Sequence, residues 1–202
     1  TTEIYTLSLH DALPIFIDKD YDLHQVLSVV QHEIHRAAMD RKHPFRYVAL
    51  GTSNDTIAMR YVVLRKVEKD FKLVLYTDHR SGKVDQIRSN PKGQLLFYHP
   101  QKKVQVIVSG IITFHNTDGV AEKHWQYVQG EARKAYCSVQ APGTPIDRPE
   151  EAYKWDSQMN SEHFAVLHFE PTSIEVLQLR GLEHLRAIFE KTDKWKGTWV
   201  VP

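Results

Sequence analysis

The sequence contains a single cysteine and almost no net charge. Because Cys137 has no second cysteine to pair with, an internal disulfide is excluded. The formal net charge is +1, and lysines and arginines are spread along the chain, so the sequence predicts no broad positive surface for nucleic acid or an anionic membrane. Any anion must therefore be bound by a local group of side chains.

Long apolar runs are also missing. No uninterrupted apolar segment approaches the roughly 20 residues that are needed to cross a bilayer. With 202 residues, of which 42% are apolar and 25% charged, the chain can bury one sizeable core. We therefore expect a cytoplasmic protein with one domain over residues 16–202, a small-molecule ligand, and neither a nucleic acid nor a membrane as partner.

The first fifteen residues form a separate segment. TTEIYTLSLHDALPI resembles a translated sequencing adapter, so we expect residues 1–15 to be a scar rather than native sequence, with the natural start upstream of about Phe16. A signal peptide is the alternative, but the stretch has no basic n-region, and Glu3, His10 and Asp11 interrupt it. Sequencing the genomic locus decides between the two.

The spacing of apolar residues changes at about Pro44. Before it, helical spacing from residue 22 predicts one amphipathic helix that ends between Asp40 and Pro44. After it, short β-branched and aromatic runs joined by short turns favour an antiparallel sheet closed into a barrel. We expect strands at 46–52, 56–67, 73–77, 94–99, 103–115, 164–170, 173–180, 185–189 and 195–201, and later helices at 82–90, 118–127, 131–139 and 150–159.

One turn is a candidate anion-binding site. In YTDHRSGK, residues 76–83, a strand ends and a helix begins at Ser81. Helix N-termini present unpaired amides and a partial positive charge, so they attract anions. Arg80 and Lys83 add two cations there, which oppose the helix dipole unless an anion lies between them. A phosphate held by Ser81, Arg80 and Lys83 is one interpretation, and a helix end with two solvated cations is the other; the turn alone does not separate them.

Two histidines one helical turn apart, His32 and His35, raise the question of a metal site. Their HEIH string lacks the histidine spacing of a zinc-protease helix. We therefore interpret them as a solvated face and expect no metal site.

Three blocks of sequence together resemble the pyridoxamine 5'-phosphate oxidase family. They are MRYVVLRKV (59–67), LYTDHRSGKVDQIRSNPKGQLLFY (75–98) and VQVIVSG (104–110), and the resemblance runs from about Arg46 to Pro202. The RSxK form of the turn and the LRG tripeptide at 179–181 are similar to one FMN-binding branch of the family. The resemblance implies a mainly β (α+β) fold, an antiparallel split β-barrel with flanking helices, which binds flavin mononucleotide (FMN). It also implies a homodimer whose flavin sites lie between the two barrels.

The resemblance further implies which residues bind FMN. Arg60 and Arg65 match basic positions near its phosphate, but a strict two-residue period puts them on opposite strand faces, so a bulge or a long reach is required. Gln105 matches a glutamine that hydrogen-bonds the isoalloxazine edge. Gln140 and Arg186 match positions that complete the site from the partner subunit, where Arg186 would stabilise charge at flavin N1. The expected cofactor-binding residues are Arg60, Arg65, Tyr76, Thr77, Arg80, Ser81, Lys83, Gln105, Gln140 and Arg186.

The substrate side departs from the family pattern. Vitamin oxidases carry Arg-x-His near the C-terminus, where this sequence has Leu182-Glu183-His184, and Leu177 replaces a flavin-flanking tryptophan. We therefore expect an FMN-dependent oxidoreductase acting on an unidentified small molecule, with catalytic residues that the sequence does not identify. The alternatives are a non-catalytic FMN-binding or storage protein, and a haem-binding relative on the same barrel, for which no histidine stands out as axial ligand.

Overall fold

Six antiparallel strands close a barrel in the computed structural model, which describes residues 16–179 and 181–202. The predictions for residues 1–15 and for residue 180 lie outside the described residues. Along the sheet the strands are hydrogen-bonded in the order β3-β2-β1-β4-β5-β6, and β6 pairs back onto β3 to close the ring. The barrel strands are β1 (Tyr47–Ser53), β2 (Ile57–Val67), β3 (Leu73–Asp78), β4 (Lys92–His99), β5 (Val104–His115) and β6 (Phe164–Gln178).

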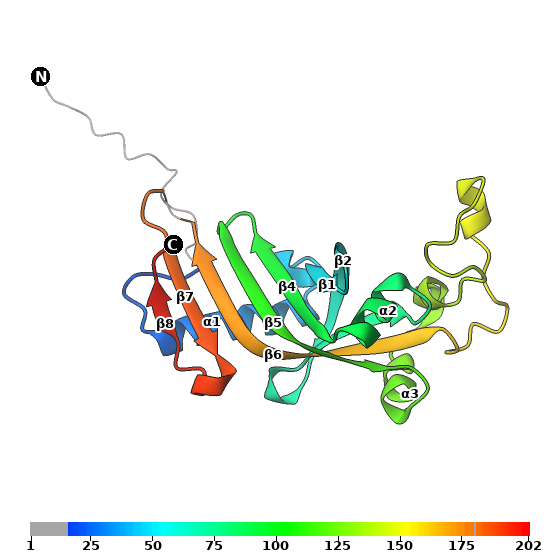
Figure 1. Ribbon diagram of the computed structural model, residues 1–202, viewed down its shortest axis with the longest axis horizontal. Helices are drawn as coiled ribbons and strands as arrows, with labels where there is room; N and C mark the ends of the chain where they lie inside the picture. Colours follow the sequence, from blue (N-terminus) through cyan, green and yellow to red (C-terminus); the bar gives the residue numbers. More distant parts are fainter. Residues whose placement is uncertain (1–15, 180) are drawn as a thin grey trace, which may run out of the picture.

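Two further strands extend the sheet beyond the barrel. They are β7 (Leu185–Glu190), which pairs with β6, and β8 (Thr198–Val200), which pairs with β7. Figure 1 shows these two strands at one end of the molecule and the loop between α3 (Gly119–Trp125) and β6 at the other end, with β6 running between them. The predicted antiparallel barrel is confirmed, although the last strand is shorter than the expected 195–201.

The core is built by the two-residue alternation of the strands. On β5, Val104, Val106 and Val108 are fully buried while the residues between them are partly exposed. The helix α1 (Leu23–Met39) adds its apolar stripe to the same core and starts at a capping box formed by Asp22 and Gln25. The helical period predicted before Pro44 is therefore confirmed. No helix in the described part of the chain is long and apolar enough to cross a membrane.

The strand β6 is one continuous element, so the expected break between 164–170 and 173–180 is wrong. A bulge in its pairing with β5, between Ser109 and Gly110, leaves Thr172 out of register beside Pro171, which cannot donate a backbone hydrogen bond. The two strands approach so closely there that a Cβ on Gly110 would lie 2.4 Å from the carbonyl oxygen of Glu170. Only glycine fits where the two strands cross. The close approach lets β6 bend, so that it pairs within the barrel and also with β7.

Two predicted helices are absent from the described residues. Helix α2 (Gly82–Ser89) and α3 match expectations, but 131–139 forms a 3₁₀ helix at Gly130–Tyr136, and 150–159 forms only a 3₁₀ turn at Pro149–Ala152. The second segment buries no side chain, and short helices in water depend on packing of an apolar face. Helical propensity alone was therefore insufficient there.

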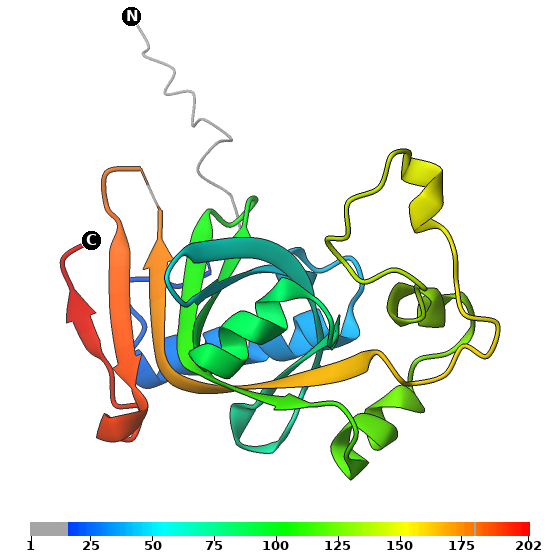
Figure 2. The same ribbon diagram turned by 45° about the vertical axis from the view of Figure 1, so that its right-hand side comes forward.

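A small second core positions the segment after α3. Tyr136 packs there with Phe164 and Val166 of β6 and with Val74 of β3. Figure 2 shows this segment at the same end of the molecule as α3, near the start of β6. The packing brings a long loop to the carboxyl end of β3, beside the turn that the sequence singled out.

Candidate functional site

A cavity of about 310 Å³ lies between the barrel and the loop after α3. This volume is at the lower end of the roughly 300–1,000 Å³ that is usual for small-molecule sites. Strands β2 and β3, helix α2 and the loop all contribute to its wall. Its lining includes Arg60, Arg65, Tyr76, Thr77, Lys83 and Tyr136.

Lys83 faces this cavity and contacts only neutral groups. Its ammonium donates to Thr77 Oγ1 at 3.0 Å and to Ser81 Oγ at 2.9 Å. Burial lowers the pKa of Lys83, and the nearby Arg60 lowers it further, while Asp78 raises it. Because Arg80 already holds the carboxylate of Asp78, Lys83 has no ion-pair partner of its own among the described residues.

Arg60 is a second cation without a carboxylate partner among those residues. Its guanidinium donates to Thr52 Oγ1 at 2.6 Å, to Gln86 Oε1 at 2.9 Å and to the carbonyl oxygen of Leu50 at 3.3 Å. Burial lowers the pKa of Arg60. These neutral acceptors hold the side chain in place and leave its charge uncompensated.

Arg65 reaches the same cavity because β2 contains a bulge. The pairing of β2 with β3 shifts register between Leu64 and Lys66, which turns Arg65 out of the strict alternation. The sequence predicts that Arg60 and Arg65 need a bulge to share a ligand, and β2 contains a bulge at Arg65. Arg65 donates to Tyr136 Oη at 3.2 Å, but its buried Nε has no hydrogen-bond partner. A buried donor without a partner suits an anionic ligand.

The turn before α2 leaves the helix N-terminus without a side-chain cap. Ser81 occupies the N-cap position, yet its hydroxyl donates to the carbonyl oxygen of Asp78 at 2.8 Å instead of accepting from the amides of α2. Ser81 is buried and lies next to the Lys83 ammonium. The helix end, Ser81 and Lys83 therefore form one positive group at the cavity.

Arg80 points elsewhere. It pairs with Asp78, with Nη2 and Oδ2 2.7 Å apart, and it donates to the carbonyl oxygens of Ser138 and Val139 at 2.8 and 3.2 Å. Asp78, two residues earlier, satisfies a guanidinium that we expected at a phosphate. In this structure Arg80 ties the turn to the loop after α3 and does not line the cavity.

Replacing Arg80 by alanine should therefore reduce stability. Asp78 is buried, with 4% of its side chain exposed, and would lose its charged partner. An unsatisfied buried acceptor costs about 1–3 kcal/mol in the free energy of unfolding. Urea denaturation without flavin measures this loss, with Arg148→Ala as the exposed control. Equal stability of the two variants would contradict the assigned role.

Tyr76 and Tyr136 add aromatic surface to the cavity. Burial raises the pKa of Tyr76 to about 12, so its hydroxyl is neutral at physiological pH, and Oη lies 2.9 Å from Nδ1 of His124. Tyr136 was missed by sequence reasoning, because only the long-range packing of the loop brings it to Arg65. The sequence signal that could have found it is an aromatic residue in an otherwise polar helical segment.

The remaining predicted residues divide between two places. Gln140 lines an adjoining cavity of about 250 Å³, which shares Asp78, Ala135 and Pro142 with the first. Gln105 and Arg186 do not line either cavity. They lie in one cross-strand row on the outside of the sheet, since Gln105 is opposite Leu177 and Leu177 is opposite Arg186. Arg186 there pairs with Glu175 at 3.0 Å.

The closed barrel with its extended β6 defines the class of the fold, a split barrel. An FMN-binding protein related to pyridoxamine 5'-phosphate oxidase from Nostoc punctiforme has the same fold, with a TM-score of 0.71 at 24% identity, over 87% of this chain and 96% of that one. PhzG from Burkholderia lata gives a TM-score of 0.70 at 17% identity, over 87% of this chain and 92% of that one.

Sequence comparison identifies the family. Residues 25–116 match the FMN-binding domain of pyridoxamine 5'-phosphate oxidase. A pyridoxine/pyridoxamine 5'-phosphate oxidase from Pelagibacter ubique is 28% identical over 165 residues, which cover 76% of this chain and 78% of the relative. Residues 25–116 therefore belong to the pyridoxamine 5'-phosphate oxidase FMN-binding domain family. The assignment of the chain to the RSxK branch stays a prediction.

Proposed function

We propose that the protein is an FMN-dependent oxidoreductase, with FMN bound in the cavity between β2, β3, α2 and the loop after α3. The observation that carries the proposal is the convergence of Arg60, Arg65 and Lys83 on one cavity without a carboxylate partner among the described residues. Three uncompensated cations are unfavourable together unless an anion joins them. The phosphate of FMN supplies that anion, and the residues present therefore fit the cofactor of the family.

Each part of the site has a role in this proposal. Lys83, Ser81 and the end of α2 bind the phosphate, and Arg60 and Arg65 complete the positive group. Tyr76 and Tyr136 provide aromatic surface beside it. Bound FMN supplies the redox chemistry, because flavins accept and donate hydride equivalents. The protein's contribution is to hold the cofactor.

A titration tests this proposal. Flavin fluorescence should report tight FMN binding and much weaker binding of riboflavin, which has the same ring system without the phosphate. Stopped-flow mixing of the FMN-loaded protein with candidate donors then separates an enzyme from a store. Reduction and reoxidation at catalytically useful rates support the oxidoreductase. Tight FMN binding without reduction by any donor in the series would leave an FMN-binding or storage protein.

We also propose that two copies form a homodimer through the outer face of β1, β2 and β4. Large apolar side chains are exposed on this face, including Ile57, Met59 and Tyr61 on β2, whose exposed fractions are 82%, 64% and 78%. Ile57 and Met59 line a depression of about 330 Å³ together with residues such as Ala49, Leu96 and Ile107. A contiguous apolar patch of this kind is typical of a protein interface.

The positions of the predicted site residues support the same arrangement. Gln105 lies opposite Tyr98 on the outer sheet face and in the same row as Arg186, outside the cavity of its own chain. If both contact FMN, they do so from a second copy. Two-fold symmetry would then generate two equivalent sites, each built from both chains.

A charge placed in this face should separate the copies. We expect light scattering of the wild-type protein to give twice the 23.5 kDa chain mass, and Met59→Asp to give the mass of one chain, because an aspartate cannot be buried unpaired in an apolar interface. Met39→Asp, on the exposed end of α1, is the matched control and should remain a dimer. A wild-type monomer fully loaded with FMN would overturn the proposal.

A further inference from the structure

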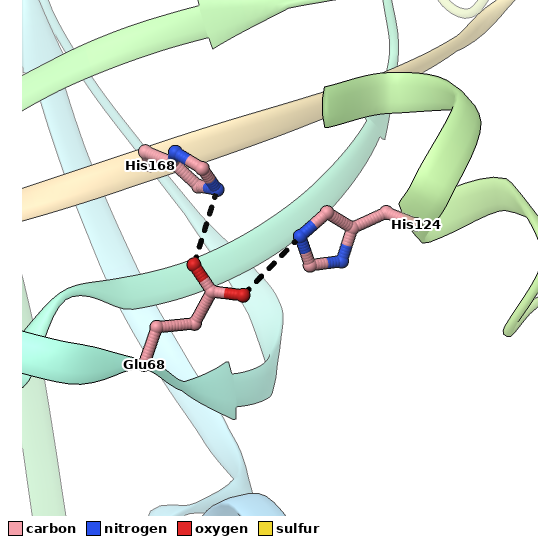
Figure 3. A group of neighbouring side chains, drawn as sticks. All are labelled: Glu68, His124 and His168. Carbon is pink, nitrogen blue, oxygen red and sulfur yellow. Dashed lines mark ion pairs between the residues drawn. The ribbon is translucent and has the colours of Figure 1, made fainter. Parts of the chain in front are cut away.

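Two histidines and a glutamate that are far apart in sequence meet at the edge of the barrel. Glu68 follows β2 at the turn to β3, His124 lies in the last turn of α3, and His168 lies on β6. Figure 3 shows the Glu68 carboxylate between the two imidazoles, with each oxygen directed at one Nε2 atom. His124 Nε2 is 3.5 Å from Oε1, and His168 Nε2 is 3.7 Å from Oε2.

We propose that Glu68, His124 and His168 bind a divalent transition-metal ion, with Zn²⁺ as the best match. The three candidate ligand atoms lie within 4.8 Å of one another. Zinc ligands lie about 2.0–2.2 Å from the ion, so tetrahedral ligand atoms are about 3.3–3.6 Å apart. Small rotations of the side chains therefore bring all three to one ion. Two histidines with one carboxylate are a donor set that zinc enzymes use.

The state of His168 supports a ligand at this point. Its Nε2 atom is buried and has no hydrogen-bond partner, although only 8% of the side chain is exposed. A buried imidazole nitrogen without a hydrogen-bond partner is available to coordinate a metal.

His124 has the outer contact that metal-bound histidines commonly need. Its Nδ1 lies 2.9 Å from Tyr76 Oη, which leaves Nε2 directed at Glu68. Such a contact on the second ring nitrogen fixes the tautomer and the orientation of the ligand. Since Tyr76 also lines the cavity described above, an ion at this site would hold α3 and the wall of that cavity in a fixed relation.

One cation competes with the ion. Lys66 Nζ lies 3.2 Å from Glu68 Oε1, but 45% of the Lys66 side chain is exposed, so the ammonium can move into solvent. The Glu68 side chain is itself 23% exposed, which gives the ion a route from solvent. The three protein ligands leave a fourth tetrahedral position for water.

Zinc titration of the full chain tests the proposal. Calorimetry with Zn²⁺ should show about one tight site per chain in the wild-type protein, and Glu68→Gln should weaken it by at least about a hundredfold, beyond the tenfold to hundredfold typical of changes to outer contacts. His32→Gln combined with His35→Gln removes an exposed histidine pair and should leave the tight site unchanged. Equal zinc affinity in wild type and Glu68→Gln, or loss of the tight site in the control, would overturn the proposal.

Two further readouts keep the test independent of folding defects and of flavin. Zn²⁺ should raise the thermal midpoint of the wild-type protein, and that of Glu68→Gln much less, by mass action on the folded state. If Glu68→Gln does not fold, His168→Gln takes its place. X-ray absorption of the zinc-loaded protein should show two imidazole ligands and no sulfur, with or without FMN. A spectrum without imidazole would overturn the site.

Discussion

Replacing Lys83 by methionine is expected to weaken FMN binding by roughly tenfold to a hundredfold while changing riboflavin binding by less than about threefold. Methionine keeps an unbranched apolar stem similar to the methylene chain of lysine but removes the ammonium group that lies at Thr77 and Ser81. A hydrogen bond to a charged group contributes roughly 1.5–3 kcal/mol, which corresponds to this change in affinity. Only FMN, the ligand with a phosphate, should bind more weakly when this charge is removed.

Fluorescence titration of both ligands measures the difference. Lys42→Met is the matched control, because Lys42 is exposed and lies outside the cavity. It makes the same change of charge and should bind both flavins as the wild type does. If Lys83→Met lowers the affinities for FMN and riboflavin equally, the phosphate lies elsewhere, even if the flavin ring still binds in this cavity.

The FMN-loaded protein is expected to oxidise pyridoxamine or pyridoxine 5'-phosphate on the order of a thousandfold less efficiently, in kcat/KM, than a vitamin oxidase of the family. Where those enzymes carry an arginine beside the substrate, this chain has Leu182, which is fully exposed in the loop between β6 and β7. A site that pairs a polar substrate group loses several kcal/mol when its partner is removed.

Oxygen-dependent formation of pyridoxal 5'-phosphate is the deciding assay. The Pelagibacter ubique relative, assayed in parallel, provides the positive control. The Leu182→Arg variant tests whether the missing cation causes the low rate of oxidation. It should oxidise the substrate faster if the loop can reach the substrate. Wild-type turnover of about one per second at micromolar substrate, within the usual range for enzymes, would refute the prediction.

The barrel could be predicted from the sequence because the two-residue alternation of β5, with Val104, Val106 and Val108 buried, is a local property of the chain. The proximity of Ser81 and Lys83 at the start of α2 could be predicted for the same reason, since they lie within three residues of each other in the sequence. The sequence shows that Arg60 and Arg65 need a bulge to share a cavity, but the position of the bulge depends on the pairing of β2 with β3.

The features that the sequence could not predict depend on contacts between distant segments. Arg80 was expected at a phosphate, and only the structure shows that Asp78 and the carbonyl oxygens of Ser138 and Val139 occupy its donors. The alignment of Gln105 with Arg186 depends on the register of β5, β6 and β7. No sequence spacing connects Glu68, His124 and His168, because three separate elements supply them.

The absorption spectrum of the freshly purified protein, with the released chromophore identified by chromatography, tests the central claim most directly. We predict a flavin spectrum, release of FMN rather than riboflavin, and about one FMN per chain after saturation, as expected for two equivalent sites in a dimer. A haem spectrum, or a protein that takes up no flavin from saturating FMN, would contradict the account.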